Sequence, residues 1–242
     1  MTEDLPRGTW DPWAVPPGPG GLELEAATVD AAREPLVAAC RHLAGRGLSP
    51  GGSGNVSVRI GSSLLITPTG SSLSRVRPAE LAVATVEPGP PSGDPSDPVP
   101  SKELPLHRAV YAARPDAVAV VHLHSPAAVA ASCLEPAALP RETATGPLPA
   151  VTPYQVMRLG DLPVAPFALP GSAALAAGVA ALAADAPAML LANHGSLVAG
   201  AHLPAALDLA EELEAAAQVV LLLAGVPHRR LTAAQVAALR AR

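Results

Sequence analysis

The chain has 242 residues, 49% of them hydrophobic, which is enough apolar material for one packed domain. A net charge of -5, with no basic cluster larger than two arginines, excludes nucleic acids and anionic membrane surfaces as expected partners. The amino terminus lacks a signal-peptide pattern and no apolar run reaches bilayer length, so we expect no membrane segment and a cytoplasmic protein whose two cysteines form no disulfide.

Proline and glycine dominate the first residues, so we expect a flexible arm at 1–23 and a single domain at 24–242. A recurring apolar period of three to four residues predicts a helix from Thr28 to Gly47. Short apolar runs bounded by turns predict three strands next, and a loop with six prolines follows over 88–100. The strands are expected at 55–60, 63–66 and 81–86.

The second half of the chain alternates between helical and strand patterns without a regular βαβ rhythm. Strands are predicted in the run 117–125, in the run that ends at His194, and as short pieces in irregular chain over 151–170. This mixture predicts one α/β layered domain. The helices are expected at 101–113, 126–133, 172–184, 203–224 and from Thr232 onward.

Two histidines separated by one residue, His122 and His124, are the first candidates for a functional site. They lie in a β-branched apolar run, and alternate residues of a strand share a face, so both imidazoles are expected to point the same way. Neutral imidazole is a good ligand for zinc, and a strand with two of them supplies half of a tetrahedral site. The alternative is a buried pair satisfied by backbone carbonyl groups.

A third histidine follows a later apolar run, in the sequence Asn193-His194-Gly195. Gly195 permits a sharp turn, which places the His194 imidazole at a strand end, where α/β proteins usually build their sites. The alternative is a turn histidine exposed to water. Because three histidines with one open position are typical of catalytic zinc, we expect a catalytic metal site.

Lys102 is the one lysine among 16 basic residues, and Glu103 follows it directly. Since every other basic residue is an arginine, this lysine indicates a place for a compact ammonium group, unless it persists by chance on a solvated loop. Glu103 has three interpretations: a fourth metal ligand, a general acid or base, or a first-turn carboxylate that complements a helix dipole.

Two turns rich in glycine, serine and threonine precede these residues, at 51–55 and 67–72. Backbone amides and hydroxyls in such turns can bind a phosphate, although each turn alone is more often an ordinary hairpin. The glycine-rich turn, Thr-Pro-Thr-Gly, Ser-Lys-Glu, His-Leu-His and Asn-His-Gly occur in this order over residues 50–200. Together they resemble the class II aldolase/adducin superfamily, typified by zinc-dependent fuculose-phosphate aldolase. A later helix containing Glu211-Glu-Leu-Glu-Ala extends the resemblance to about residue 225.

Within this superfamily the chain is most similar to the 3-oxo-tetronate 4-phosphate decarboxylases. Fuculose-type aldolases have a serine where Lys102 stands, and ribulose-phosphate 4-epimerases usually have aspartate where Glu103 stands. The decarboxylase motifs Lys-Glu, His-Leu-His-Ser, Ser-Cys-Leu, Tyr-x-Val-Met-Arg-x-Gly and Leu-Leu-Ala-Asn-His-Gly occur at 102–103, 122–125, 132–134, 154–160 and 190–195.

The resemblance implies a single three-layer domain in which helices flank a mixed, mostly antiparallel sheet. It also implies a homotetramer with active sites at subunit interfaces, and one zinc ion, or another divalent metal, in each subunit. The metal ligands would be Glu103, His122, His124 and His194, with Glu103 also the catalytic residue. The substrate and its phosphate would be bound by Asn55, Thr69, Gly70, Ser101 and Lys102.

The implied reaction converts 3-oxo-tetronate 4-phosphate into dihydroxyacetone phosphate and carbon dioxide through a metal-bound enediolate, with Glu103 delivering the proton. The alternative enzyme is a class II aldolase that cleaves a ketose phosphate of the fuculose type into dihydroxyacetone phosphate and an aldehyde. A non-catalytic adducin-like scaffold is the alternative from another class. Tyr154 and Arg158 would enter a neighbouring subunit's site or serve in packing.

Three positions depart from the family pattern. Gly52 replaces a common threonine, which removes one hydroxyl from the expected phosphate-binding turn. Gly70 stands where asparagine is frequent in the decarboxylases, and Pro105 is expected to interrupt the helix after Glu103. These departures concern the choice of substrate more than the metal chemistry.

Overall fold

A seven-stranded sheet forms the centre of the part of the chain that this computed structural model describes, which is residues 28–88, 96–135 and 143–241. Its strand order is β3-β2-β1-β4-β9-β8-β7, and neighbouring strands are antiparallel except β7 and β8, which are parallel. The predicted mostly antiparallel sheet is therefore confirmed. The strands are β1 (Asn55–Ile60), β2 (Ser63–Ile66), β3 (Ala82–Thr85), β4 (Ala119–Leu123), β7 (Val164–Ala165), β8 (Ala188–Leu191) and β9 (Gly195–Gly200).

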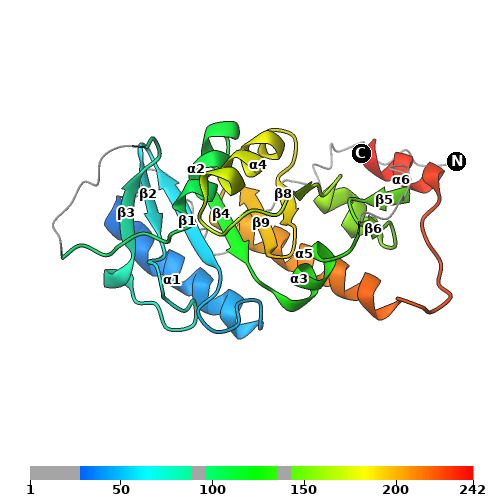
Figure 1. The fold of residues 1–242 in the computed structure, drawn as a ribbon, viewed down its shortest axis with the longest axis horizontal. Coiled ribbons are helices and arrows are strands. Elements are labelled where there is room, and N and C mark those ends of the chain that lie inside the picture. The colour runs from blue at the N-terminus through cyan, green and yellow to red at the C-terminus, as the bar shows by residue number, and fades with distance from the viewer. Residues whose placement is uncertain (1–27, 89–95, 136–142, 242) are drawn as a thin grey trace, which may run out of the picture.

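Helices cover both faces of this sheet and complete the three predicted layers (Figure 1). Side chains alternate along β4, so Val121 and Leu123 enter one apolar core while Val120 enters the other. The first core is covered by α1 (Val29–Gly45), α3 (Pro126–Ser132) and α5 (Leu203–Leu222), and the second by α2 (Leu104–Ala113) and α4 (Ala173–Ala183).

A smaller group of elements lies beyond β7 and β8 at one end of the molecule (Figure 1). It contains a two-stranded ribbon, β5 (Ala144–Thr145) and β6 (Leu148–Pro149), and the last helix, α6 (Ala233–Arg240). Ala150, Val156 and Val236 form its apolar centre. Of the helices described, none combines the length and the apolar character needed to cross a membrane.

The segment 151–170 differs from its prediction. Instead of several short strands it contains a π-helical turn, Gln155–Leu159, and a single two-residue strand, β7. Side-chain hydrogen bonds favour the helical turn, because the Thr152 hydroxyl accepts from the Gln155 backbone and the Gln155 amide oxygen accepts from the Val151 backbone. The strand prediction for this segment is therefore wrong except at β7.

The start of α2 also differs from its prediction. The helix begins at Leu104 rather than at residue 101, and Pro105 lies in its first turn, where a missing backbone donor has no helical partner to lose. Pro105 therefore does not interrupt the helix. The predicted arm at 1–23 lies outside the described residues, as does part of the loop 88–100.

Candidate metal centre

The central strand β4 positions the first two histidines. His122 is fully buried and pairs with Asn55 on β1 and with Leu197 on β9. His124 follows just beyond the end of β4 and is half-buried. The glycine-rich turn packs tightly against this point, because a Cβ on Gly54 would lie 2.9 Å from the His122 carbonyl oxygen. Gly54 also has φ +80°, a conformation that favours glycine.

The third histidine lies in a tight turn between two strands rather than at the end of one. The predicted strand ends at Leu191, and β9, which the sequence analysis missed, begins at Gly195. Ser132 fixes the turn, because its carbonyl accepts from the Asn193 backbone and its hydroxyl accepts from the His194 backbone. A Cβ on Gly195 would overlap the Leu123 carbonyl oxygen, so only glycine lets the turn approach β4 this closely.

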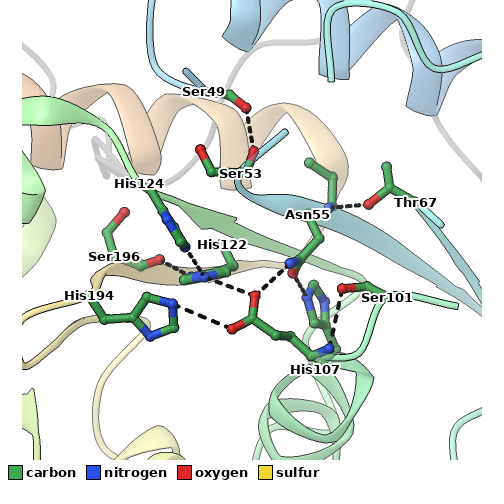
Figure 2. Close-up of polar contacts among 12 residues, drawn as sticks. Ser49, Ser53, Asn55, Thr67, Ser101, His107, His122, His124, His194 and Ser196 are labelled. Atoms are coloured by element: carbon green, nitrogen blue, oxygen red, sulfur yellow. Dashed lines mark hydrogen bonds and ion pairs between the residues drawn. The ribbon is translucent and has the colours of Figure 1, made fainter. Parts of the chain in front are cut away.

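The end of β4, the turn between β8 and β9 and the start of α2 bring four candidate ligands together. The nitrogen and oxygen atoms of Glu103, His122, His124 and His194 that could bind a metal all lie within 4.8 Å of one another. Glu103 Oε2 is 3.2 Å from His122 Nε2, and Glu103 Oε1 is 3.4 Å from His194 Nε2. The Nε2 atoms of His122 and His124 are 3.0 Å apart, and Figure 2 shows the three imidazoles converging from β4 and the β8–β9 turn.

Burial and neighbouring groups keep His124 and His194 neutral and the Glu103 carboxylate ionised. Burial, followed by the neighbouring His122, lowers the pKa of His194, and the same influences lower the pKa of His124 to about 4. Burial alone would raise the pKa of Glu103, but its contacts with His122 and Asn55 outweigh burial and hold the pKa well below its usual range. Neutral imidazoles and an ionised carboxylate are the protonation states in which these side chains bind metals.

Two further observations fit a bound cation. His122 Nδ1 lies 2.8 Å from the Ser196 carbonyl oxygen and donates to it, so Nε2 is the ring nitrogen that faces the cluster. Glu103 Oε1 and both ring nitrogens of His194 are buried without a hydrogen-bond partner. Buried polar atoms without partners are costly, and a metal ion would satisfy those that face the cluster. Three imidazoles and one carboxylate suit zinc and several other divalent transition metals.

A hydrogen-bond network that the sequence analysis missed lies behind Glu103. Glu103, His107 and Tyr111 follow one another at four-residue intervals along the start of α2, and Asn55 and Ser57 alternate on β1 opposite them. All five side chains are buried. Their spacing along the sequence places them on shared faces of a helix and a strand, but only the structure brings these faces together.

Two of the predicted substrate-binding residues, Thr69 and Gly70, line a cavity to which none of the four candidate metal ligands contributes. Thr69, Gly70 and Ser71 line an open cavity of about 520 Å³, and Gly52 lies against Ser71. Ser101 is buried next to this turn, since its backbone donates to the Thr67 carbonyl. A phosphate-binding role for these residues stays a prediction.

Four other predicted residues are placed differently relative to the cluster. Lys102 is exposed, and its charge helps to lower the pKa of His124 and of His194, so its ammonium group is within electrostatic reach of the centre. Asn55 already uses both ends of its amide within the protein. Tyr154 is exposed, and Arg158 lines a separate cavity with His202 and Asp208, so their entry into a neighbouring site stays a prediction.

The chain is similar to one known family and to several known relatives. Residues 34–221 match the model of the class II aldolase and adducin N-terminal domain family. A 3-oxo-tetronate 4-phosphate decarboxylase from Escherichia coli is 43% identical over 196 residues, covering 81% of this chain and 88% of the relative. An L-fuculose phosphate aldolase from the same species is 34% identical over 188 residues, covering 77% and 80%.

A crystal structure gives the same fold. YgbL from Klebsiella pneumoniae, whose description leaves its reaction open among aldolase, epimerase and decarboxylase, superposes with a TM-score of 0.79 and 40% identity. The superposition covers 88% of this chain and all of YgbL.

Proposed function

The chain belongs to the class II aldolase and adducin family and is a lyase of that family, and on this premise we propose that it decarboxylates a phosphorylated 3-oxo sugar acid. The favoured substrate is 3-oxo-tetronate 4-phosphate, and the products are dihydroxyacetone phosphate and carbon dioxide. The observation that carries the proposal is the cluster of Glu103 with three histidines, in a chain 43% identical to a decarboxylase of that name.

The reaction sets clear demands on the site. The bond between the carboxylate carbon and C2 breaks, its electron pair remains with C2 and the adjacent ketone, and carbon dioxide leaves. A proton must then be added at C2. The enzyme therefore needs a group that stabilises negative charge on the ketone oxygen and a group that holds a proton near C2.

The histidines and Glu103 would hold a divalent metal, and zinc is our prediction for it. Bound there, the metal would supply Lewis-acid stabilisation of the negative charge that develops on the substrate oxygen. The protein contributes the shape of the site, because Ser196 orients His122 and Ser132 orients the His194 turn. These contacts fix the imidazoles before substrate binds.

Glu103 is the residue we expect to handle the proton. Its carboxylate is ionised, so it acts first as a ligand or base and must take up a proton before it can deliver one to C2. Oε1 is the oxygen available for this transfer, because Oε2 already accepts from Asn55 at 2.9 Å while Oε1 has no hydrogen-bond partner.

The remaining predicted residues would bind the two ends of the substrate. The turn with Thr69 and Gly70, together with Ser101, offers hydroxyl and amide donors to the phosphate. Lys102 would pair with the substrate carboxylate or phosphate as a point charge. We further expect a cytoplasmic homotetramer in which neighbouring subunits complete each site.

A class II aldolase is the second candidate, because the same site would stabilise the charge formed when a ketose phosphate is split, and a relative named as such an aldolase is 34% identical. Offering both 3-oxo-tetronate 4-phosphate and fuculose 1-phosphate to the metal-loaded protein separates the two. Carbon dioxide from the first substrate alone supports decarboxylation, whereas an aldehyde from the second alone refutes it. Glu103→Gln is the inactive comparison, and Glu34→Gln, at an exposed glutamate of α1, is the matched control.

A further inference from the structure

Five buried side chains form a continuous hydrogen-bonded chain that ends at Glu103, and we call it the relay: Tyr111, Ser57, His107, Asn55 and Glu103. Asn55 Nδ2 donates to Glu103 Oε2 at 2.9 Å, and Asn55 Oδ1 lies 2.5 Å from His107 Nε2. His107 Nδ1 lies 2.7 Å from the Ser57 hydroxyl, which in turn lies 2.9 Å from the Tyr111 hydroxyl. Figure 2 shows His107 and Asn55 next to each other, on the side of the view away from His194.

The relay has one consistent arrangement of protons. An ionised Glu103 can only accept, so the Asn55 amide must turn its NH₂ group toward Glu103 and its oxygen toward His107. That oxygen is an acceptor, so His107 must carry its proton on Nε2. The ring is neutral, since burial lowers the pKa of His107 to about 3, and Nδ1 therefore accepts from the Ser57 hydroxyl.

The opposite tautomer would reverse the effect on Glu103. A proton on Nδ1 would leave Nε2 as an acceptor, and the Asn55 amide would have to rotate to offer it an NH₂ group. The Asn55 oxygen would then face Glu103 Oε2, which places two acceptors in contact at a buried position. The tautomer of His107 therefore decides whether Asn55 can donate a hydrogen bond to Glu103. The His107 ring itself contacts neither a metal ligand nor the substrate.

We propose that His107 is a positioning residue for the reaction: through Asn55 it fixes the Glu103 carboxylate so that Oε2 is anchored and Oε1 is left for metal and proton. The inference rests on the proposed function, because it gives Glu103 a role at the reaction centre. It also makes Asn55 part of the device that orients Glu103, in place of a free phosphate-binding residue.

The direct test is the tautomer of His107 in the zinc-loaded protein. Two-bond ¹H–¹⁵N correlation spectra distinguish the protonated nitrogen of each histidine ring, and the signals missing in His107→Gln assign this residue. The relay predicts a proton on Nε2 and an unprotonated Nδ1. A proton on Nδ1 overturns the proposal, whatever the enzyme turns over.

A matched pair of variants tests the consequence for catalysis. His107→Gln keeps an amide NH₂ group where Nε2–H stands and should retain the contact with Asn55. His107→Asn has the same chemistry but is one carbon shorter, so it reaches Ser57 and not Asn55. Arg108→Gln changes the next residue of α2, which bonds to Thr85 away from the relay, and serves as the control.

We expect His107→Asn to lower kcat about 10- to 100-fold per bound metal, with a much smaller change in KM, and His107→Gln to recover most of that loss. A purely structural role predicts equal thermal destabilisation of both variants with unchanged kcat in the folded fraction, and that result overturns the proposal. If the wild-type protein turns over neither candidate substrate, the proposed function fails by itself. The tautomer measurement then still decides the relay.

Discussion

Replacing His107 with glutamine should flatten the dependence of stability on pH below neutrality. His107 is fully buried, and its pKa is about 3 in the folded protein against 6.5 for the free side chain. The unfolded chain therefore binds a proton that the folded protein excludes. The resulting stability is complete above about pH 6.5 and is lost as the pH falls from there toward 3.

The magnitude follows from these two values. Between about pH 7 and pH 5.5 the single histidine should cost about 1.3 kcal/mol of unfolding free energy. At pH 5.5 the folded ring remains unprotonated, because this pH lies well above its pKa of about 3. The loss of unfolding free energy between about pH 7 and pH 5.5 therefore comes almost entirely from protonation of this histidine in the unfolded chain.

Urea unfolding of wild type and His107→Gln at both pH values provides the assay, with the metal concentration held constant. Other titrating groups, including the metal ligands, contribute to both proteins and cancel in the comparison. The wild type should lose about 1.3 kcal/mol more than the variant. Equal losses in the two proteins would refute the assignment of a neutral, buried His107.

The other predictions concern the metal cluster and the turn that supports it. Glu103→Gln should lower turnover by about 10²- to 10⁴-fold while the circular dichroism spectrum is retained, and near-normal turnover would remove its proton-transfer role. His194→Ala should lose most of its bound metal by elemental analysis; full occupancy would mean that another group is the ligand. Gly195→Ala should lower the free energy of unfolding by about 1–3 kcal/mol or more, because the new Cβ meets the Leu123 carbonyl, whereas Gly45→Ala, with open space around it, should not. Equal effects at the two glycines would contradict the close approach of the turn.

The sequence indicated the four side chains that the structure brings together because their geometry is mostly local, and their metal-binding role stays a prediction. Alternation along one strand aligns His122 with His124, and the order of motifs along the chain supplied Glu103 and His194 through a family resemblance that the comparisons confirm. The strands at 55–60 and 63–66 were predicted to the residue, since each is bounded by glycine-containing turns.

Features that depend on tertiary contacts were missed. The strand β9 begins directly after the His194 turn, and its glycine and serine residues do not resemble a strand until they pair with β4. The π-helical turn after Thr152 depends on side-chain hydrogen bonds that compete with strand propensity.

The relay was missed for a related reason. Glu103, His107 and Tyr111 have helical spacing in the sequence, but such spacing does not tell a buried polar face from a solvated one. In the sequence Ser57 is an ordinary strand residue, and only the structure shows that its hydroxyl bonds to His107. Only the packing of α2 on β1 turns these residues into a network.

Dihydroxyacetone phosphate release from 3-oxo-tetronate 4-phosphate tests the central claim most directly, followed through an NADH-consuming reductase during stepwise chelation and reloading of the metal. We predict that the rate rises in proportion to bound metal in the wild type and stays near background in Glu103→Gln at the same occupancy. Release that continues unchanged in the fully chelated, folded protein, or the absence of release at full occupancy, would contradict a metal-dependent decarboxylase with Glu103 at its centre.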